Sequence, residues 1–253
     1  MASQKKLRIG VYCPGSTQLL DLSCVDIFGM LDPSYLGGLG LPSSVVDLGV
    51  PCEINYISAP KMEEDHIELT ANAFLRATKT IKDTDVQPGM LDIVLVPGPD
   101  PSEIFPEDIL DFVRGHANFK GSDGRTTEIL SVCTGCSLLA QAGLLNGKRS
   151  SGPRGLIPML KKKYPAIKWD DSKRWVHEGT FWSSGGITNG QEMVAAYLRH
   201  NYPSPTTEMV LAMADVGEKG IDYSQSKAGM NIWFVFQIIR AGLFCGGKRT
   251  KVL

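Results

Sequence analysis

The stretch Glu128-Ile-Leu-Ser-Val-Cys-Thr-Gly-Cys-Ser-Leu-Leu-Ala-Gln-Ala-Gly143 decides the fold of this chain. Residues 128–132 are predicted to form a short apolar strand and residues 135–142 a helix, with Cys133 on the turn between them. Such a turn projects its residue at the carboxyl edge of a sheet, over the helix N-terminus. Exposed amides and the positive helix end there favour a thiolate over a thiol. The sequence therefore predicts a nucleophilic or reactive cysteine, with a buried structural cysteine as the alternative.

Short apolar segments and amphipathic segments alternate on both sides of this turn. Strands are predicted at residues 7–12, 52–58, 92–96 and 180–183, a strand or hairpin at 67–75, and helices at 109–118, 156–164, 191–200 and 208–217. This alternation predicts a parallel sheet with helices on both faces. Residues 32–51 are rich in Gly, Pro and Ser, and we interpret them as a surface excursion, either a lid or an interface loop.

Three further residues are candidates for the site. Asp21 follows the first strand, so it is either a helix cap or an acid at the same sheet edge as Cys133. Gly98 follows the buried strand at 92–96 and permits close approach of the backbone to a ligand. His177 lies in a predicted strand, where it is either a structural or exposed histidine or an accessory base.

Composition excludes several classes of function. The chain has 253 residues and a formal net charge of −1, so we expect no nucleic-acid partner. No run of about 18 apolar residues predicts a membrane span. The six cysteines lack the spacing of a disulfide framework and the start lacks a signal core, so we expect a cytoplasmic protein.

No motif predicts a metal or a cofactor. Cys133 and Cys136 form a single CxxC, but a dithiol motif needs both sulfurs at the turn, and Cys136 is predicted to face inward. A second CxxC or a spaced pair of histidines, which a metal site would want, does not occur. The Gly-rich turn at 184–192 lacks a Walker lysine and a dinucleotide fingerprint.

The chain is predicted to be one domain, residues 1–253. Its core covers about residues 8–200, and residues 201–253 form a C-terminal helical extension. The strongly apolar segment 231–244 is expected to be a helix or an extended arm that packs on the core or on another subunit.

Several stretches carry a family resemblance. They are Pro14-Gly15 with residues 18–26, residues 92–98, Ser131-Val-Cys-Thr-Gly, Ala142-Gly-Leu-Leu-Asn-Gly-Lys-Arg, and Gly185-Gly-Ile-Thr-Asn-Gly. On these motifs the chain resembles the ThiJ/PfpI superfamily, the cysteine branch of the class I glutamine-amidotransferase-like fold, over roughly residues 8–199. The resemblance implies a three-layer, flavodoxin-like α/β sandwich with a mostly parallel sheet, a nucleophile elbow and a homodimer.

Thr134 argues against the protease-like and glyoxalase-like branches of the family, because these branches commonly carry a histidine after the nucleophilic cysteine. Cys-Thr-Gly together with Leu20-Asp21-Leu22 looks most like the isonitrile hydratase branch. It also looks like the amidotransferase-like domains of AraC-type regulators, but residues 201–253 are too few for their DNA-binding module and are not basic. Hydratase-like and regulator-like relatives usually carry a further histidine where this chain has Pro153, so a Cys–His mechanism would require His177 or another histidine in its place.

The resemblance implies a Cys–Asp mechanism on a small electrophilic substrate. Cys133 would be the nucleophile and Asp21 an acid beside it, with the amides of Gly98 and Thr134 supporting the thiolate or a developing anion. The product from an isonitrile would be an N-substituted formamide. Two alternatives stay open: a peroxide-responsive redox protein that uses Cys133, and a biosynthetic lyase or hydrolase that acts on a carbonyl compound, with residues 32–51 and the tail as pocket walls.

Overall fold

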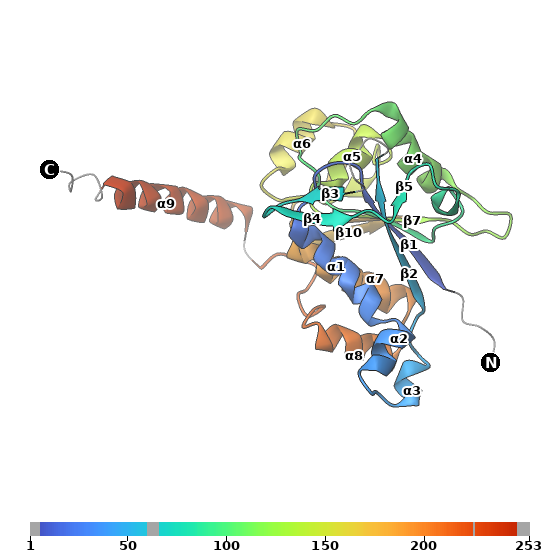
Figure 1. Ribbon diagram of the computed structural model, residues 1–253. Coiled ribbons are helices and arrows are strands. Elements are labelled where there is room, and N and C mark those ends of the chain that lie inside the picture. Colours follow the sequence, from blue (N-terminus) through green and yellow to red (C-terminus); the bar gives the residue numbers. More distant parts are fainter. Residues whose placement is uncertain (1–5, 60–65, 225, 247–253) are drawn as a thin grey trace.

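A seven-stranded sheet forms the centre of the protein (Figure 1). The computed structural model describes residues 6–59, 66–224 and 226–246. The strands are β1 (Leu7–Cys13), β2 (Cys52–Ser58), β5 (Lys79–Thr80), β6 (Ile93–Val96), β7 (Glu128–Ser131), β10 (Trp175–Glu178) and β11 (Phe181–Ser184). They lie in the order β10-β11-β7-β6-β1-β2-β5, and only the β10–β11 pair is antiparallel. The predicted mostly parallel α/β sheet is confirmed.

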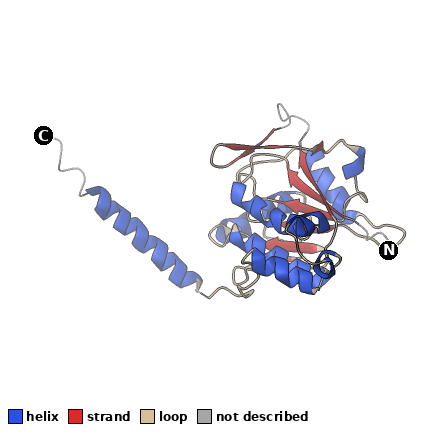
Figure 2. Ribbon diagram, turned by 60° about the horizontal axis from the view of Figure 1, so that its bottom comes forward, coloured by secondary structure: helices blue, strands red, loops and turns tan. Residues whose placement is uncertain are grey.

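Helices cover both faces of this sheet (Figures 1 and 2). One face carries α1 (Ser23–Met30), α7 (Thr188–Asn201) and α8 (Pro205–Met213), and the other carries α4 (Glu107–Asn118), α5 (Gly135–Gln141) and α6 (Ile157–Lys163). Each face has its own apolar cluster. The four residues of β6 are all fully buried because their side chains alternate between the two clusters.

Small β elements surround the sheet. They are the hairpin of β3 (His66–Leu69) and β4 (Ala73–Arg76), and the short parallel pair of β8 (Arg149–Ser150) and β9 (Lys168–Trp169). The hairpin lies beside the loop that follows β1, because the N–H of Thr17 donates to Glu68 O (2.9 Å) and the N–H of Thr70 donates to Thr17 O (3.0 Å). The predicted hairpin at 67–75 is therefore confirmed, and it supports the loop that leads to Asp21.

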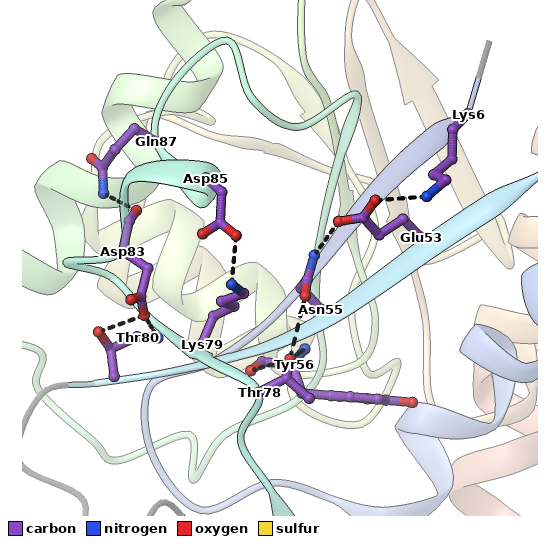
Figure 3. Close-up of polar contacts among 10 residues, drawn as sticks. All are labelled: Lys6, Glu53, Asn55, Tyr56, Thr78, Lys79, Thr80, Asp83, Asp85 and Gln87. Atoms are coloured by element: carbon purple, nitrogen blue, oxygen red, sulfur yellow. Dashed lines mark hydrogen bonds and ion pairs between the residues drawn. The ribbon is translucent and has the colours of Figure 1, made fainter.

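The far edge of the sheet is closed by polar contacts between β2, β5 and the following turn (Figure 3). Lys79 Nζ lies 2.5 Å from Asp85 Oδ2, and Asp83 Oδ2 accepts from the N–H of Thr80 at 2.6 Å. Exposed ion pairs of this kind contribute little stability. These contacts lie at the opposite edge of the sheet from β10 and β11, where they hold β5 and the following turn against β2.

Residues 32–51 form two short helices, α2 (Pro33–Gly38) and α3 (Ser43–Val46), which pack near α1 and α8. Leu36 of α2 is fully buried in the cluster beneath them. The segment leads directly into β2, so it lies at the amino edge of a parallel sheet, whereas Cys133 lies at the carboxyl edge. The segment is therefore not a lid over Cys133, although its last residues, Leu48 to Pro51, line a separate pocket with Tyr202, Pro203 and Ser204.

The C-terminal extension has two different parts. Helix α8 packs into the main body, with Val210 and Leu211 fully buried. Helix α9 (Lys227–Gly246) instead projects away from the body (Figures 1 and 2). Its large apolar side chains between residues 232 and 239 are 51–71% exposed, so the predicted packing of this segment on the core is wrong. Among the described residues, no helix is both long enough and apolar enough to cross a membrane.

Candidate active site

Cys133 occupies a strained turn between β7 and α5. Its φ is +56°, a left-handed conformation that costs a residue with a side chain roughly 1–2 kcal/mol. Two backbone hydrogen bonds fix the turn: the N–H of Val132 donates to Val96 O (2.9 Å), and the N–H of Cys133 donates to Gly185 O (3.2 Å). The turn therefore holds the sulfur at the carboxyl edge of the sheet, as the nucleophile elbow requires.

Asp21 lies at the same edge, in a 3-10 turn between residues 19 and 22. Its side chain is fully buried, and its Oδ2 accepts the N–H of Gly98 at 2.9 Å. Oδ1 is buried without a hydrogen-bond partner among the described residues. Gly98 is required here because a Cβ on this residue would lie 2.5 Å from Asp21 Oδ2 and 2.5 Å from Thr134 Oγ1. The fold thus brings together the acid and the cysteine that the sequence predicted.

The side chains of Asp21 and Cys133 form a coupled pair. Burial raises the pKa of Asp21 to about 6, against the lowering effects of the Gly98 amide and the Cys133 thiol. Burial and the charge of Asp21 raise the pKa of Cys133 to about 11. Between these two values the pair holds one proton, which either group can carry. Burial is the main cause of the raised pKa of Asp21.

The amides at the helix end favour a thiolate, as expected, but they do not decide the pKa of Cys133. The backbone N–H groups of Thr134 and Ile187 do lower the pKa of Cys133, as an anion-stabilising helix terminus should. Desolvation of the sulfur and repulsion from Asp21 outweigh them. The free thiolate is therefore a minor form at neutral pH.

The amide of Thr134 interacts with Cys133 as expected, whereas the amide of Gly98 does not. Thr134 Oγ1 also donates to Pro99 O at 2.7 Å. The amide of Gly98 donates to Asp21, and a single N–H that holds a carboxylate is not also directed at the sulfur. Gly98 therefore positions the acid, which corrects its assignment as a donor to the anion.

Ile187 is a site residue that the sequence reasoning missed. Its N–H interacts with the Cys133 sulfur, and its φ of +38° lies in a region that residues with side chains rarely adopt. The two glycines at 185 and 186, immediately before α7, were the available signal. A Gly-rich turn at a helix N-terminus presents backbone amides to an anion.

His177 lies on β10, away from this pair. Its ring stacks on Trp182 with 3.9 Å between centroids, its Nε2 lies 2.8 Å from Gly179 O, and it is near His200. Within the described part of the chain, which includes all four histidines, none contributes to the pKa of Cys133. The structure thus does not bring the accessory candidate to the site. At the position of the expected histidine, Pro153 begins the turn into α6.

The second cysteine of the CxxC faces the core. Cys136 is fully buried in the cluster under α4 and α6, as predicted, and burial raises the pKa of its thiol. Among the described residues, no group of three or more His, Cys, Asp or Glu side chains could hold a metal ion.

The DJ-1/PfpI family model matches residues 49–200. The chain belongs to the DJ-1/PfpI family. Solved structures show the same fold: a ThiJ/PfpI family protein from Pseudomonas syringae superposes with a TM-score of 0.61 at 16% identity, covering 94% of this chain and 87% of the other. DJ-1beta from Drosophila melanogaster superposes with a TM-score of 0.60 at 14% identity, covering 84% and 98%.

The chain is also similar to a curated protein whose name states an activity. Isonitrile hydratase from Pseudomonas putida is 33% identical over 141 residues, which cover 54% of this chain and 55% of that protein. The match thus spans about half the length of this relative. It supports a moderate similarity to a hydratase of the family.

Proposed function

We propose that the protein is a cysteine-dependent hydratase that converts isonitriles into N-substituted formamides. The observation that carries the proposal is the buried Asp21, which is held by Gly98 beside Cys133 and shares one proton with it. The partial similarity to isonitrile hydratase supports the same reaction.

The first step forms a covalent thioimidate. Cys133 Sγ attacks the terminal carbon of the isonitrile while its proton passes to Asp21, whose pKa of about 6 makes it an effective base near neutral pH. Asp21 then donates that proton to the same carbon. The result is R–N=CH–S–Cys133 with Asp21 ionised again, so the thiol has added across the carbon and no other reactant is needed.

The second step releases the product with water. Water attacks the thioimidate carbon, Asp21 accepts one of its two protons, and the substrate nitrogen receives the other. The C–S bond then breaks and the sulfur recovers the proton from Asp21, which leaves R–NH–CHO. The amides of Thr134 and Ile187 are placed to stabilise negative charge on sulfur during attack and departure.

The raised pKa of Cys133 disfavours the resting thiolate that the peroxide-responsive alternative uses. Oxidation by peroxide requires a thiolate, and a thiol with a pKa of about 11 is almost wholly protonated near neutral pH. A hydratase with an internal base does not need the free thiolate in its resting state.

Replacement of Cys133 by alanine is expected to abolish formamide production, because no covalent intermediate can form. The measurement is product analysis by NMR with a panel of alkyl and aryl isonitriles, on the purified wild-type protein and the Cys133→Ala variant. Cys52→Ala is the matched control, since Cys52 lies at the amino end of β2. Equal formamide production by the wild type and by Cys133→Ala would refute the assignment of Cys133 as the nucleophile. Production by neither, with Cys133 converted to a sulfinate by mild peroxide, would favour the redox alternative.

We also propose a homodimer in which α9 contacts a second copy of the chain. Support comes from its exposed apolar side chains, which a single copy leaves in water. A chain that ends after Ser224 is expected to halve the mass measured by light scattering. This cut retains α8, which is part of the core. An unchanged dimer would exclude α9 as the contact.

A further inference from the structure

The segment Gly220–Tyr223, beyond the region matched by the family model, reaches the nucleophile through a row of backbone hydrogen bonds. The N–H of Arg174 donates to Ile221 O (2.7 Å), and the N–H of Gly185 donates to Arg174 O (2.8 Å). The carbonyl of Gly185 accepts the N–H of Cys133 (3.2 Å). The row therefore connects the C-terminal region to the elbow.

Side chains anchor this segment at several points. Asp222 forms an ion pair with Lys173 (Nζ to Oδ1, 2.6 Å) and pairs with it in an antiparallel bridge. The guanidinium groups of Arg154 and Arg174 lie over the ring of Tyr223, 4.4 and 4.7 Å from its centroid. Cation–π contacts of this kind restrict the position of the ring.

The hydroxyl of Tyr223 contacts two residues of the turn that faces Cys133, Gly185 and Asn189. Asn189 Nδ2 donates to this hydroxyl at 3.0 Å, and the oxygen lies 2.5 Å from the position that a Cβ on Gly185 would take. Asn189 belongs to the first turn of α7, and its own N–H donates to Gly186 O at 3.0 Å. Between Gly186 and Asn189 lies Ile187, whose N–H interacts with the sulfur.

Ile187 has an unfavourable backbone conformation, with φ +38° and ψ −89°. Such a conformation persists only where the surroundings hold it. The Tyr223–Asn189 hydrogen bond is a tertiary contact that reaches the turn from outside the α7 segment.

We propose that Tyr223 is a positioning residue for Cys133. By holding Asn189 and the turn at 185–189, it keeps in place the Gly185 carbonyl that accepts the N–H of Cys133. It also keeps in place the backbone of Ile187, whose N–H lowers the pKa of the thiol. The role rests on Cys133 as the reactive residue of the proposed function, and it adds a residue that the family match does not include.

The test is the Tyr223→Phe variant, which keeps the ring and its guanidinium contacts but removes the hydroxyl. Cys133 alkylation by iodoacetamide is followed by peptide mass spectrometry from pH 7 to 10. Loss of one hydrogen bond to the thiolate is expected to slow alkylation about 3–10-fold across this range, because the thiolate fraction changes tenfold per unit of pKa. With an isonitrile substrate, kcat should fall by a similar factor and KM should change little.

Controls separate positioning from unfolding. Tyr35→Phe alters an exposed tyrosine of α2 and should leave alkylation unchanged. Asn189→Ala should slow alkylation as Tyr223→Phe does, and the double variant should be no slower than the slower single variant. Thermal unfolding confirms that each variant is folded.

Wild-type alkylation rates in folded Tyr223→Phe would overturn the proposal. So would fully additive effects of the two substitutions. Alkylation of Cys133 does not depend on turnover. If the wild-type protein has no hydratase activity, the proposed function is refuted, but the alkylation rates still test the role of Tyr223.

Discussion

Replacing Asp21 by asparagine is expected to abolish turnover and at the same time make the Cys133 thiol more acidic. The charge of Asp21 is one of the two effects that raise the pKa of Cys133, so its removal lowers that pKa. The variant, however, loses the group that accepts and returns the proton. Loss of general acid–base catalysis of this kind typically costs about 10²–10⁴-fold in rate. The measurements are kcat with an isonitrile and the pH dependence of Cys133 alkylation.

The same substitution is expected to stabilise the protein at neutral pH. The pKa of Asp21 is raised on folding from 3.8 to about 6, so the folded state prefers the protonated acid. Wild-type stability therefore falls as pH rises from about 4 to 6, and asparagine avoids this loss. The advantage should be absent below about pH 4 and reach at most about 3 kcal/mol above pH 6, since one pKa unit corresponds to 1.36 kcal/mol. Denaturant unfolding at pH 4 and pH 7.5 measures it.

Asp26→Asn is the matched control for both experiments, because Asp26 is an exposed acid on the neighbouring helix α1. It should change neither turnover nor the alkylation profile. The mechanism would be wrong if Asp21→Asn kept wild-type kcat. A slower alkylation of Cys133 in that variant would contradict the electrostatic account of the pair.

Gly135→Ala is expected to destabilise the protein severely. A Cβ on Gly135 would lie 2.2 Å from Val96 O, a backbone atom at the end of β6, and 3.1 Å from Pro97 O. Backbone atoms of a buried central strand cannot move aside as a flexible side chain can. Overpacking of a core typically costs 1–3 kcal/mol and occasionally more, and we expect roughly 3 kcal/mol or more here. Denaturant unfolding measures the loss.

Gly37→Ala provides the control for Gly135→Ala. Gly37 is exposed in the short helix α2, and a Cβ there would meet nothing within 4 Å. Alanine has the higher helix propensity, so this variant should be as stable as the wild type or up to about 1 kcal/mol more stable. Equal stability of both variants would show that the elbow tolerates a Cβ.

Local sequence patterns were sufficient for most of the fold. The apolar run at 93–96 and the strand-to-helix switch at 128–142 gave the central strands and the elbow, because periodicity and turn residues act over a few positions. The apolar tail was identified as a helix or arm, but its packing was not predictable. Whether α9 contacts the body depends on the path of the preceding residues, which periodicity does not describe.

The candidate site was predicted in part. Cys133, Asp21 and Thr134 lie together as expected, since the carboxyl ends of parallel strands share one edge of the sheet. Gly98 lies there as well, but its amide serves Asp21. His177 lies in a strand as predicted, yet its neighbours are Trp182 and His200. The presence of a histidine in a strand shows that a base is available. It does not show which other side chains the imidazole will contact.

The sequence by itself determined the sheet, the elbow and the placement of Cys133 and Asp21 at one edge of the sheet. Only the tertiary structure decided the protonation of that pair, because a pKa depends on burial and on charges brought close by folding. The same holds for Ile187 and Tyr223, whose roles follow from backbone conformation and contacts between distant segments. The elbow therefore presents a cysteine whose pKa is raised by burial and by the carboxylate beside it, and in the proposed mechanism that carboxylate accepts its proton.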